Sequence, residues 1–280
     1  MTQRITSYAR DGWVFDVRDT GPLDGDPVVL LHGFPERASS WDAVAAQLHE
    51  AGLRTLAPDQ RGYSPRARPR TRWGYRATEL VADVAALVDV VGRPVHLVGH
   101  DWGAFVAWEL AAHRPDLVRT LTAVSVPHPG AFVAAARHGD QLRRSWYFLA
   151  FSLPLLPEWL AGHRADRFDA GLRRGGMTAD DLARFHRDVL AYGALPGALG
   201  WYRAVPFTPP GWARWTVGVP TTYVWSDGDV ALGRDAAERT ADFCTGPYQL
   251  VVLQGVTHWI PAQAPDLLAE VVRARIASSG

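Results

Sequence analysis

The chain contains no lysine, and its single cysteine, Cys244, cannot form an internal disulfide. All 29 basic residues are therefore arginines, and they balance 29 acidic residues, so the net charge indicates neither a nucleic-acid partner nor an acidic membrane. No apolar run approaches the about 20 residues that span a bilayer, and the polar start of the chain lacks the apolar stretch of a signal peptide. We expect a cytoplasmic protein with no nucleic-acid or membrane partner, whose oligomeric state the sequence leaves open.

Apolar residues are plentiful by contrast, since they make up 48% of the 280 residues, and aromatic residues make up 11%. This composition supports a full hydrophobic core and excludes a disordered, collagen-like or coiled-coil protein. The chain is longer than an average domain, and its length suits one α/β domain that carries an insertion.

Short β-rich runs alternate with helix-like segments at both ends of the chain. Predicted strands lie at 13–17, 27–31, 53–57, 94–98, 121–126, 221–225 and 249–253, and predicted helices at 40–51, 77–91, 103–113, 234–243 and 265–276. This alternation predicts a mostly parallel sheet flanked by helices. Because residues 131–219 have helical patterns and no strand signal, we predict a core domain from 1–130 and 220–280 with an inserted all-helical cap at 131–219.

Residues 99–103 read Gly-His-Asp-Trp-Gly and join a predicted strand to the helix that follows. Such a junction presents its central residue on a strained turn, which needs small residues on both sides. The central residue is Asp101, and no serine of the chain has a Gly-x-Ser-x-Gly setting. A carboxylate nucleophile attacks an sp³ carbon that bears a leaving group, as in an epoxide or an alkyl halide, and forms an alkyl ester that water must cleave. The alternative is that Asp101 only caps the helix.

Residues 32–35, which read His-Gly-Phe-Pro, also follow a predicted strand. In a strand–elbow–helix fold this position supplies a backbone N–H to an oxyanion hole. The two donors are then expected to be the N–H groups of Phe34 and of Trp102, the residue after the nucleophile.

Two later strands are followed by the remaining members of a possible triad. Asp227 and Asp229 come at the end of one strand, and His258 follows the next. The order nucleophile, acid, histidine is that of an α/β-hydrolase triad. Side chains two residues apart in an extended chain point to the same side, so either aspartate could face His258.

Four segments together resemble the α/β-hydrolases of the epoxide hydrolase group, which are close to haloalkane dehalogenases, along nearly the whole chain. They are the motifs at 32–35 and 99–103, Asp-Gln-Arg-Gly-Tyr-Ser at 59–64 and Val-Pro-His-Pro at 126–129. The resemblance implies the α/β-hydrolase fold and favours Asp229 over Asp227 as the acid. The chain departs from the family at Ser152, where Gln is frequent, and at Ser226, where Gly is usual.

The same resemblance implies a pair of cap tyrosines that hydrogen-bond the epoxide oxygen and that dehalogenases lack. Tyr147 and Tyr202 stand in segments similar to the two tyrosine motifs of the family. We further expect Trp102, Phe151 and Trp201 to contact the substrate.

We therefore expect an epoxide hydrolase that converts a small apolar or aromatic epoxide into a vicinal diol. No cofactor or metal is expected, since the sequence has neither a His/Cys ligand cluster nor a glycine-rich phosphate loop. Two alternatives stay open. One is a dehalogenase, in which Asp101 displaces a halide held by Trp102 and a cap donor. The other is a non-catalytic ligand-binding protein with the same fold.

An arginine-rich stretch follows the predicted strand at 53–57. Its members are Arg61, Arg66, Arg68, Arg70, Arg72 and Arg76. Because prolines interrupt it, we interpret it as a solvated loop rather than an anion site.

Overall fold

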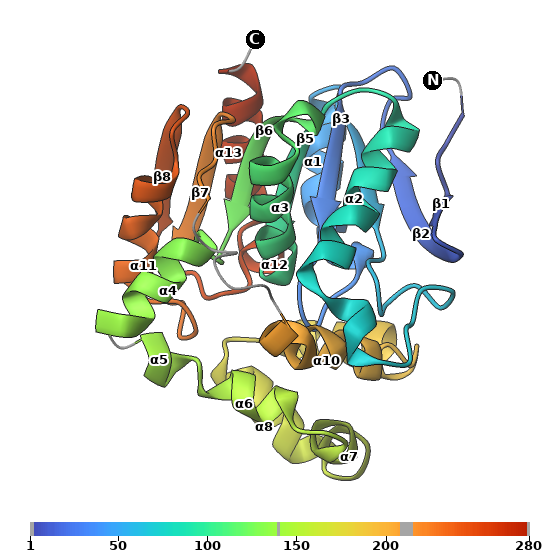
Figure 1. Cartoon of the computed structure of the whole chain (residues 1–280), viewed down its shortest axis with the longest axis vertical. Helices are drawn as coiled ribbons and strands as arrows, with labels where there is room; N and C mark the ends of the chain where they lie inside the picture. The colour runs from blue at the N-terminus through green and yellow to red at the C-terminus, as the bar shows by residue number, and fades with distance from the viewer. Residues whose placement is uncertain (1–2, 139–140, 208–214, 279–280) are drawn as a thin grey trace.

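The structure is a computed structural model, and it describes residues 3–138, 141–207 and 215–278. Figure 1 shows a twisted sheet with helices in front and behind, and a separate group of helices at one end of the strands. Among the described residues, none of the helices combines the length and the apolar character needed to cross a bilayer. The cytoplasmic location expected from the sequence stays a prediction.

Eight strands form one sheet in the order β1-β2-β4-β3-β5-β6-β7-β8, in which β1, β2 and β4 pair antiparallel and all other neighbours pair parallel. The strands are β1 (Ser7–Arg10), β2 (Trp13–Thr20), β3 (Pro27–Leu31), β4 (Arg54–Pro58), β5 (Val95–His100), β6 (Val118–Val124), β7 (Thr221–Ser226) and β8 (Tyr248–Leu253). The central strands are buried on both faces, which explains their continuous apolar sequences.

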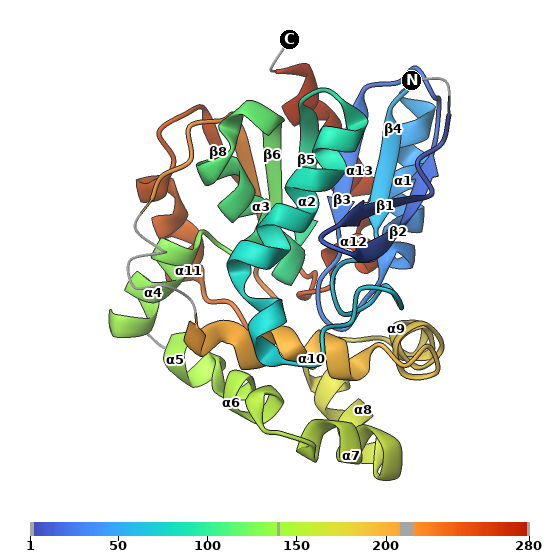
Figure 2. The same ribbon diagram turned by 45° about the vertical axis from the view of Figure 1, so that its right-hand side comes forward.

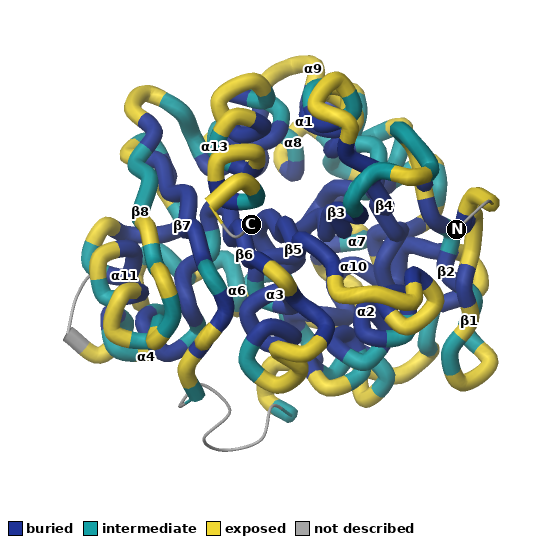
Figure 3. Tube along the Cα trace, turned by 90° about the horizontal axis from the view of Figure 1, so that it is seen from above, coloured by how far each residue is buried: buried dark blue, intermediate teal, exposed yellow. Residues whose placement is uncertain are grey.

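Helices cover both faces of the sheet. In Figure 1, α2 (Ala77–Val91) and α3 (Trp102–His113) lie in front, and α1 (Asp42–Glu50) and α13 (Pro265–Ala277) lie behind. The shorter core helices are α11 (Arg234–Arg239) and α12 (Ile260–Gln263), with 3-10 turns at Ala38–Trp41, Arg72–Tyr75, Pro115–Leu117 and Thr240–Phe243. Figure 3 shows the buried strands β3, β5 and β6 between these exposed layers. The predicted α/β-hydrolase architecture is thus confirmed.

The described chain between β6 and β7 forms only helices, turns and loops, apart from an isolated bridge at Val217. The helices are α4 (Pro129–His138), α5 (Gln141–Arg144), α6 (Trp146–Ser152), α7 (Leu156–His163), α8 (Ala165–Arg174), α9 (Ala179–Phe185), a π-helical turn at His186–Leu190, α10 (Leu195–Ala204) and a 3-10 turn at Val205–Phe207. Figure 2 shows α6 to α10 across the carboxyl end of the sheet. The boundary predicted after residue 130 falls inside α4, which packs on α11 of the core, and the exact domain limits stay a prediction.

Two strands differ from the sequence prediction. The strand β1 was not predicted, and it forms a hairpin with β2 through Asp11 and Gly12, whose φ angles are 49° and 80°. The strand β6 was expected at 121–126 but ends at Val124. The next residue, Ser125, adopts a φ of 67°, so the chain turns away from the sheet there.

Candidate active site

Asp101 lies on the turn between β5 and α3, with φ 52° and ψ −121°. The turn is tight, because a Cβ atom at Gly99 would lie 2.3 Å from the carbonyl oxygen of Gly103. At Gly103 it would lie 2.1 Å from the carbonyl oxygen of Leu31. Both glycines are therefore needed for the strand to turn into the helix with Asp101 at its apex, as expected for a nucleophile elbow.

The loop after β3 comes close to the Asp101 carboxylate. The N–H of Phe34 donates a hydrogen bond of 2.7 Å to Oδ1 of Asp101. A Cβ atom at Gly33 would lie 2.5 Å from the same oxygen, so glycine permits this approach. The N–H of Trp102 belongs to the first residue of α3 and has no partner within the helix. Both predicted oxyanion donors thus lie beside the carboxylate that is expected to react.

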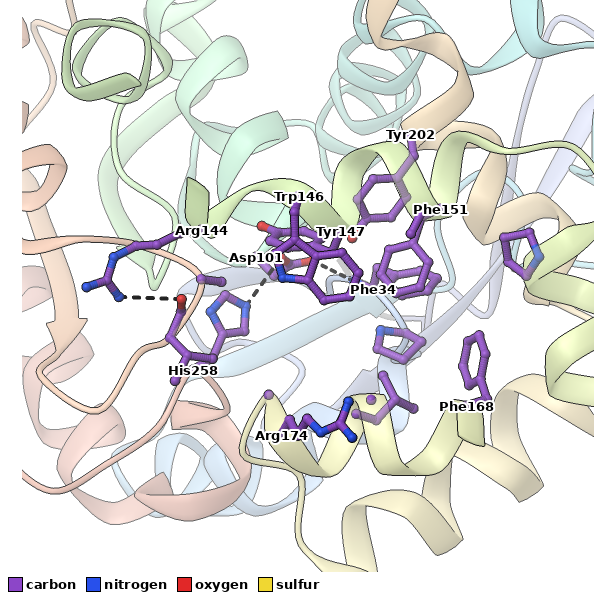
Figure 4. Close-up of a pocket in the computed structure, with 18 of the residues that line it drawn as sticks. Phe34, Asp101, Arg144, Trp146, Tyr147, Phe151, Phe168, Arg174, Tyr202 and His258 are labelled. Atoms are coloured by element: carbon purple, nitrogen blue, oxygen red, sulfur yellow. Dashed lines mark hydrogen bonds and ion pairs between the residues drawn. The ribbon is translucent and has the colours of Figure 1, made fainter. Parts of the chain in front are cut away.

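His258 joins the two carboxylates that the sequence singled out. Its Nδ1 lies 2.7 Å from Oδ2 of Asp229, and its Nε2 lies 3.3 Å from Oδ2 of Asp101. The other oxygen of Asp229 accepts hydrogen bonds from the N–H groups of Ala231 and Leu232, which fix its orientation. The three residues come from the ends of β5, β7 and β8, and Figure 4 shows His258 beside Asp101.

Asp227 takes no part in this contact. It is exposed, and its Oδ1 accepts a hydrogen bond of 2.8 Å from the N–H of Gly255, which ties the loop after β7 to the loop after β8. The choice of Asp229 over Asp227, which the family pattern favoured, therefore agrees with the side-chain positions.

The pKa values of His258 and Asp101 depend on the charges around them. Burial alone lowers the pKa of a histidine, but the charges of Asp229 and Asp101 and the hydrogen bonds to both raise the pKa of His258 to about 10. Burial would likewise raise the pKa of Asp101, but the hydrogen bond and the charge of His258 outweigh it and lower that pKa. At neutral pH the site therefore holds an imidazolium between two carboxylates.

Further residues hold the backbone of His258 and were not singled out from the sequence as part of the site. Ser125 Oγ donates to the carbonyl oxygen of His258 at 2.8 Å, and Nε2 of His100 lies 2.9 Å from the same oxygen. On its other side His100 faces Glu36, with Nδ1 and Oε2 3.2 Å apart. The sequence feature that could have indicated the role of Ser125 is a polar residue at an otherwise apolar strand end.

Tyr147 on α6 and Tyr202 on α10 reach this region from the cap. Their ring centroids are 6.4 Å apart, and the Tyr202 ring packs edge-on against Phe34 and Trp102 at 5.1 Å from each. Burial and the negative charge of Asp101 raise the pKa of both phenols well above the ordinary value. Both hydroxyl groups therefore stay protonated and can act as donors at any moderate pH.

Two cavities meet at the nucleophile. The larger has a volume of about 740 Å³ and the smaller about 250 Å³, and Asp101, Tyr147 and Tyr202 line both. Phe151 lines the larger cavity, whereas Trp102 and Trp201 line the smaller one. Every residue expected to contact the substrate therefore borders a cavity that reaches Asp101.

Among the residues that the structure describes, no three histidine, cysteine or acidic side chains come together in a way that could hold a metal ion. The arrangement that is present can perform nucleophilic attack by a carboxylate, protonation of a leaving oxygen and base-assisted attack of water.

The chain is similar to known proteins along most of its length. Residues 26–265 match the alpha/beta hydrolase fold family. The AB hydrolase superfamily protein YfhM of Bacillus subtilis is 32% identical over 94% of both chains, and epoxide hydrolase A of Mycobacterium tuberculosis is 31% identical over 86% of this chain and 87% of its own. The crystal structure of epoxide hydrolase A from Mycobacterium thermoresistibile superposes with a TM-score of 0.80 at 28% identity, covering 97% of each chain.

The chain thus belongs to the α/β-hydrolase fold family. Within it, the chain is a member of the epoxide hydrolases, as the sequence motifs had indicated.

Proposed function

We propose that this protein hydrolyses small apolar or aromatic epoxides to vicinal diols through a covalent ester on Asp101. One observation carries the proposal. The buried carboxylate of Asp101 lies where two protonated tyrosines, Tyr147 and Tyr202, border the same cavities, and a histidine–aspartate pair contacts it from the other side.

Ring opening uses the oxygen of the nucleophile that faces His258 rather than the N–H of Phe34. Phe34 holds Oδ1 of Asp101, so Oδ2 attacks an epoxide carbon. The departing oxygen is too basic to leave unaided near neutral pH, and Tyr147 and Tyr202 donate hydrogen bonds to it from the cap. The oxygen takes a proton from a tyrosine, and the imidazolium of His258 gives up the proton that restores the phenol, so the product of this step is a hydroxyalkyl ester of Asp101 beside a neutral imidazole.

The second step is made possible by the loss of the Asp101 charge. An ester is neutral, so the stabilisation of the imidazolium by Asp101 disappears and the pKa of His258 falls. The imidazole, held in orientation by Asp229, then takes a proton from the water that attacks Cγ. The N–H groups of Phe34 and Trp102 stabilise the oxyanion, and the diol leaves.

The two other functions considered for this sequence are less well supported. A halide leaving group needs indole or amide N–H donors. Tryptophans such as Trp102 line the cavities, but no asparagine or glutamine does among the described residues, and the O–H groups of Tyr147 and Tyr202, which border both cavities, suit an alkoxide instead. A binding protein without activity would have no need for His258 to be within hydrogen-bonding distance of both Asp101 and Asp229.

Trapping the ester tests the proposal. In His258→Gln the ester should form and persist, because no base activates the water. After incubation with styrene oxide, mass spectrometry of peptides should find the substrate mass on the peptide that contains Asp101. His163→Gln, a change of an exposed cap histidine, is the control and should turn over without accumulating ester. Labelling of another residue, or none, would falsify the proposed mechanism.

A further inference from the structure

The outer side of the cap carries large apolar side chains that face solvent. Trp146 and Leu149 of α6 and Leu153 directly after it recur at helical spacing, and their exposed fractions lie between 46% and 77%. More than half of the large apolar side chains that are exposed in the described chain lie between residues 142 and 159. Single exposed apolar residues are ordinary, but a cluster of them marks an interaction surface.

The same surface continues on α7. Leu155 precedes this helix, and its carbonyl oxygen accepts a hydrogen bond of 2.9 Å from the N–H of Trp159, so the two exposed residues lie one turn apart. Figures 1 and 2 both show α6 and α7 at the end of the molecule farthest from the sheet. We call this surface the apolar edge, and it consists of Trp146, Leu149, Leu153, Leu155, Leu156 and Trp159.

The part of the cap that carries the apolar edge is also rich in arginine. Residues 142–174 hold six arginines and three acids, whereas the chain as a whole has no net charge. Arg143, Arg167 and Arg174 are exposed. Like Trp146, they line the larger cavity, so they lie beside the apolar edge. The net charge of the whole chain, from which no membrane partner was expected, does not reveal this local excess of positive charge.

This combination favours a lipid surface over a second copy of the chain. Tryptophan and leucine side chains next to arginines are typical of protein surfaces that enter the headgroup layer of a membrane, where the guanidinium groups pair with phosphates. A second copy placed on the apolar edge by twofold symmetry would instead bring the arginine-rich parts of both chains together. Anionic headgroups complement the charge that a second copy would repel.

We propose that the apolar edge docks the protein on the surface of a membrane that contains anionic phospholipids. Leu149, Leu155 and Trp159 enter the boundary between headgroups and acyl chains, and the neighbouring arginines pair with the phosphates. Trp146 and Leu156 belong to the apolar edge and also line the larger cavity, so docking brings this cavity next to the lipid. The docking itself does not depend on the reaction proposed for Asp101.

Flotation of the full chain with lipid vesicles tests the proposal. The wild type should bind vesicles made of equal parts of phosphatidylcholine and phosphatidylglycerol, and it should bind vesicles of phosphatidylcholine alone about tenfold more weakly. Added salt should weaken the binding to the anionic vesicles. Phospholipids brominated on the acyl chains should quench tryptophan fluorescence, and Trp159→Phe should reduce this quenching because its indole lies at the lipid boundary.

Variants assign the binding to the apolar edge. Leu149→Ser and Leu155→Ser should each weaken binding to the anionic vesicles about tenfold, because each removes a leucine that the lipid would cover. Both leucines are exposed, so circular dichroism should find the unfolding midpoint of the wild type in each variant. The matched control is Leu267→Ser, a change of an exposed leucine on α13 of the core, and it should bind vesicles as the wild type does.

Equal binding of the wild type to the two kinds of vesicle would overturn the proposal, and so would undiminished binding by Leu149→Ser and Leu155→Ser. Light scattering tests the other occupant. A wild type that binds no vesicles and forms a dimer, which Leu149→Ser converts to a monomer, would make the apolar edge an interface between two copies and would also overturn the proposal. None of these results depends on epoxide turnover, so the proposed function stands or fails separately.

Discussion

The raised pKa of His258 gives it a charge at neutral pH, which it must lose for the second step of the proposed reaction. Its pKa of about 10 depends on the charges of Asp229 and Asp101, and the formation of the ester removes one of the two. The site therefore switches the histidine from a cation to a base at the point in the cycle when a base is needed. No external proton acceptor has to approach a buried imidazole.

Replacing the nucleophile by its neutral analogue tests this coupling. In Asp101→Asn the pKa of His258 should fall well below about 10, because the amide has no charge. NMR titration of the imidazole follows this directly. In the wild type the raised pKa stabilises the fold fully below the ordinary pKa of about 6.5, and this contribution is lost as the pH rises through about 10. The free energy of unfolding of Asp101→Asn should fall less over that range, and an unchanged imidazole pKa would contradict the coupling.

The two neighbouring aspartates should differ sharply in their effect on turnover. Asp229→Asn should reduce kcat by about 10⁴-fold, because the imidazole loses the acceptor that fixes its tautomer. Asp227→Asn should have a minor effect, since that side chain only accepts from the N–H of Gly255. Rapid-quench measurement should place the Asp229 defect in hydrolysis of the ester. A larger loss in the Asp227 variant would reverse the assignment.

The positions of some residues could be predicted from the sequence, whereas the position of Arg61 could not. Asp101 and His258 could be predicted because the motif and the strand ends place them. Arg61 was expected in a solvated loop but is buried, and it donates to both oxygens of Asp83 at 2.6 and 2.7 Å. Its partner lies on α2, 22 residues away, and a sequence pattern has no means of pairing residues across that distance without the fold.

At the scale of elements, α6 and α10 each carry one of the two tyrosines of the proposed reaction. Tyr147→Phe and Tyr202→Phe should each slow epoxide opening by roughly 10²-fold, because each loses a donor to the developing oxyanion. The double variant should be nearly inactive, since one phenol can partly replace the other. Stopped-flow measurement of ester formation gives these rates. Faster halide release from a bromoalkane than opening of styrene oxide, with both Phe variants fully active, would favour a dehalogenase.

The strands differ in how well the sequence predicted them. Apolar runs predicted the central strands because burial on both faces imposes them. The polar strand β1 has no such pattern, although Asp11-Gly12 is a strong hairpin signal and could have revealed it. The end of β6 depends on the φ angle of Ser125 and on pairing with β7, which joins the sheet about 100 residues later. No local pattern contains that information.

At the scale of the whole molecule, Arg37 connects the core to the cap. It pairs with Asp59 of the core, donates to the carbonyl oxygen of Asp188 at 3.3 Å, and lies 3.4 Å from the ring centroid of Tyr192. Asp188 and Tyr192 both belong to the chain between β6 and β7. The side chain of Arg37 therefore joins a loop of the core to a cap segment about 150 residues later in the sequence.

Removing this connection should destabilise the protein as a whole. Arg37→Met should lower the free energy of unfolding by about 3 kcal/mol, because Asp59 is left largely buried without its partner. Arg18→Met is the matched control: the Arg18–Asp42 pair is exposed, and its loss should cost less than about 1 kcal/mol. Denaturant unfolding followed by tryptophan fluorescence measures both. Equal losses in the two variants would mean that the connection adds nothing beyond an ordinary surface pair.

In the proposed reaction, the bond that water breaks also determines the origin of one oxygen atom of the product. Because the N–H of Phe34 holds Oδ1 of Asp101, it is Oδ2 that forms the ester and departs within the diol when water attacks Cγ. The solvent oxygen remains behind in the restored carboxylate. In water labelled with heavy oxygen, the first diol released therefore contains no heavy oxygen. The carboxylate of Asp101 gains one heavy oxygen atom in that first turnover, and its original oxygen leaves in the diol.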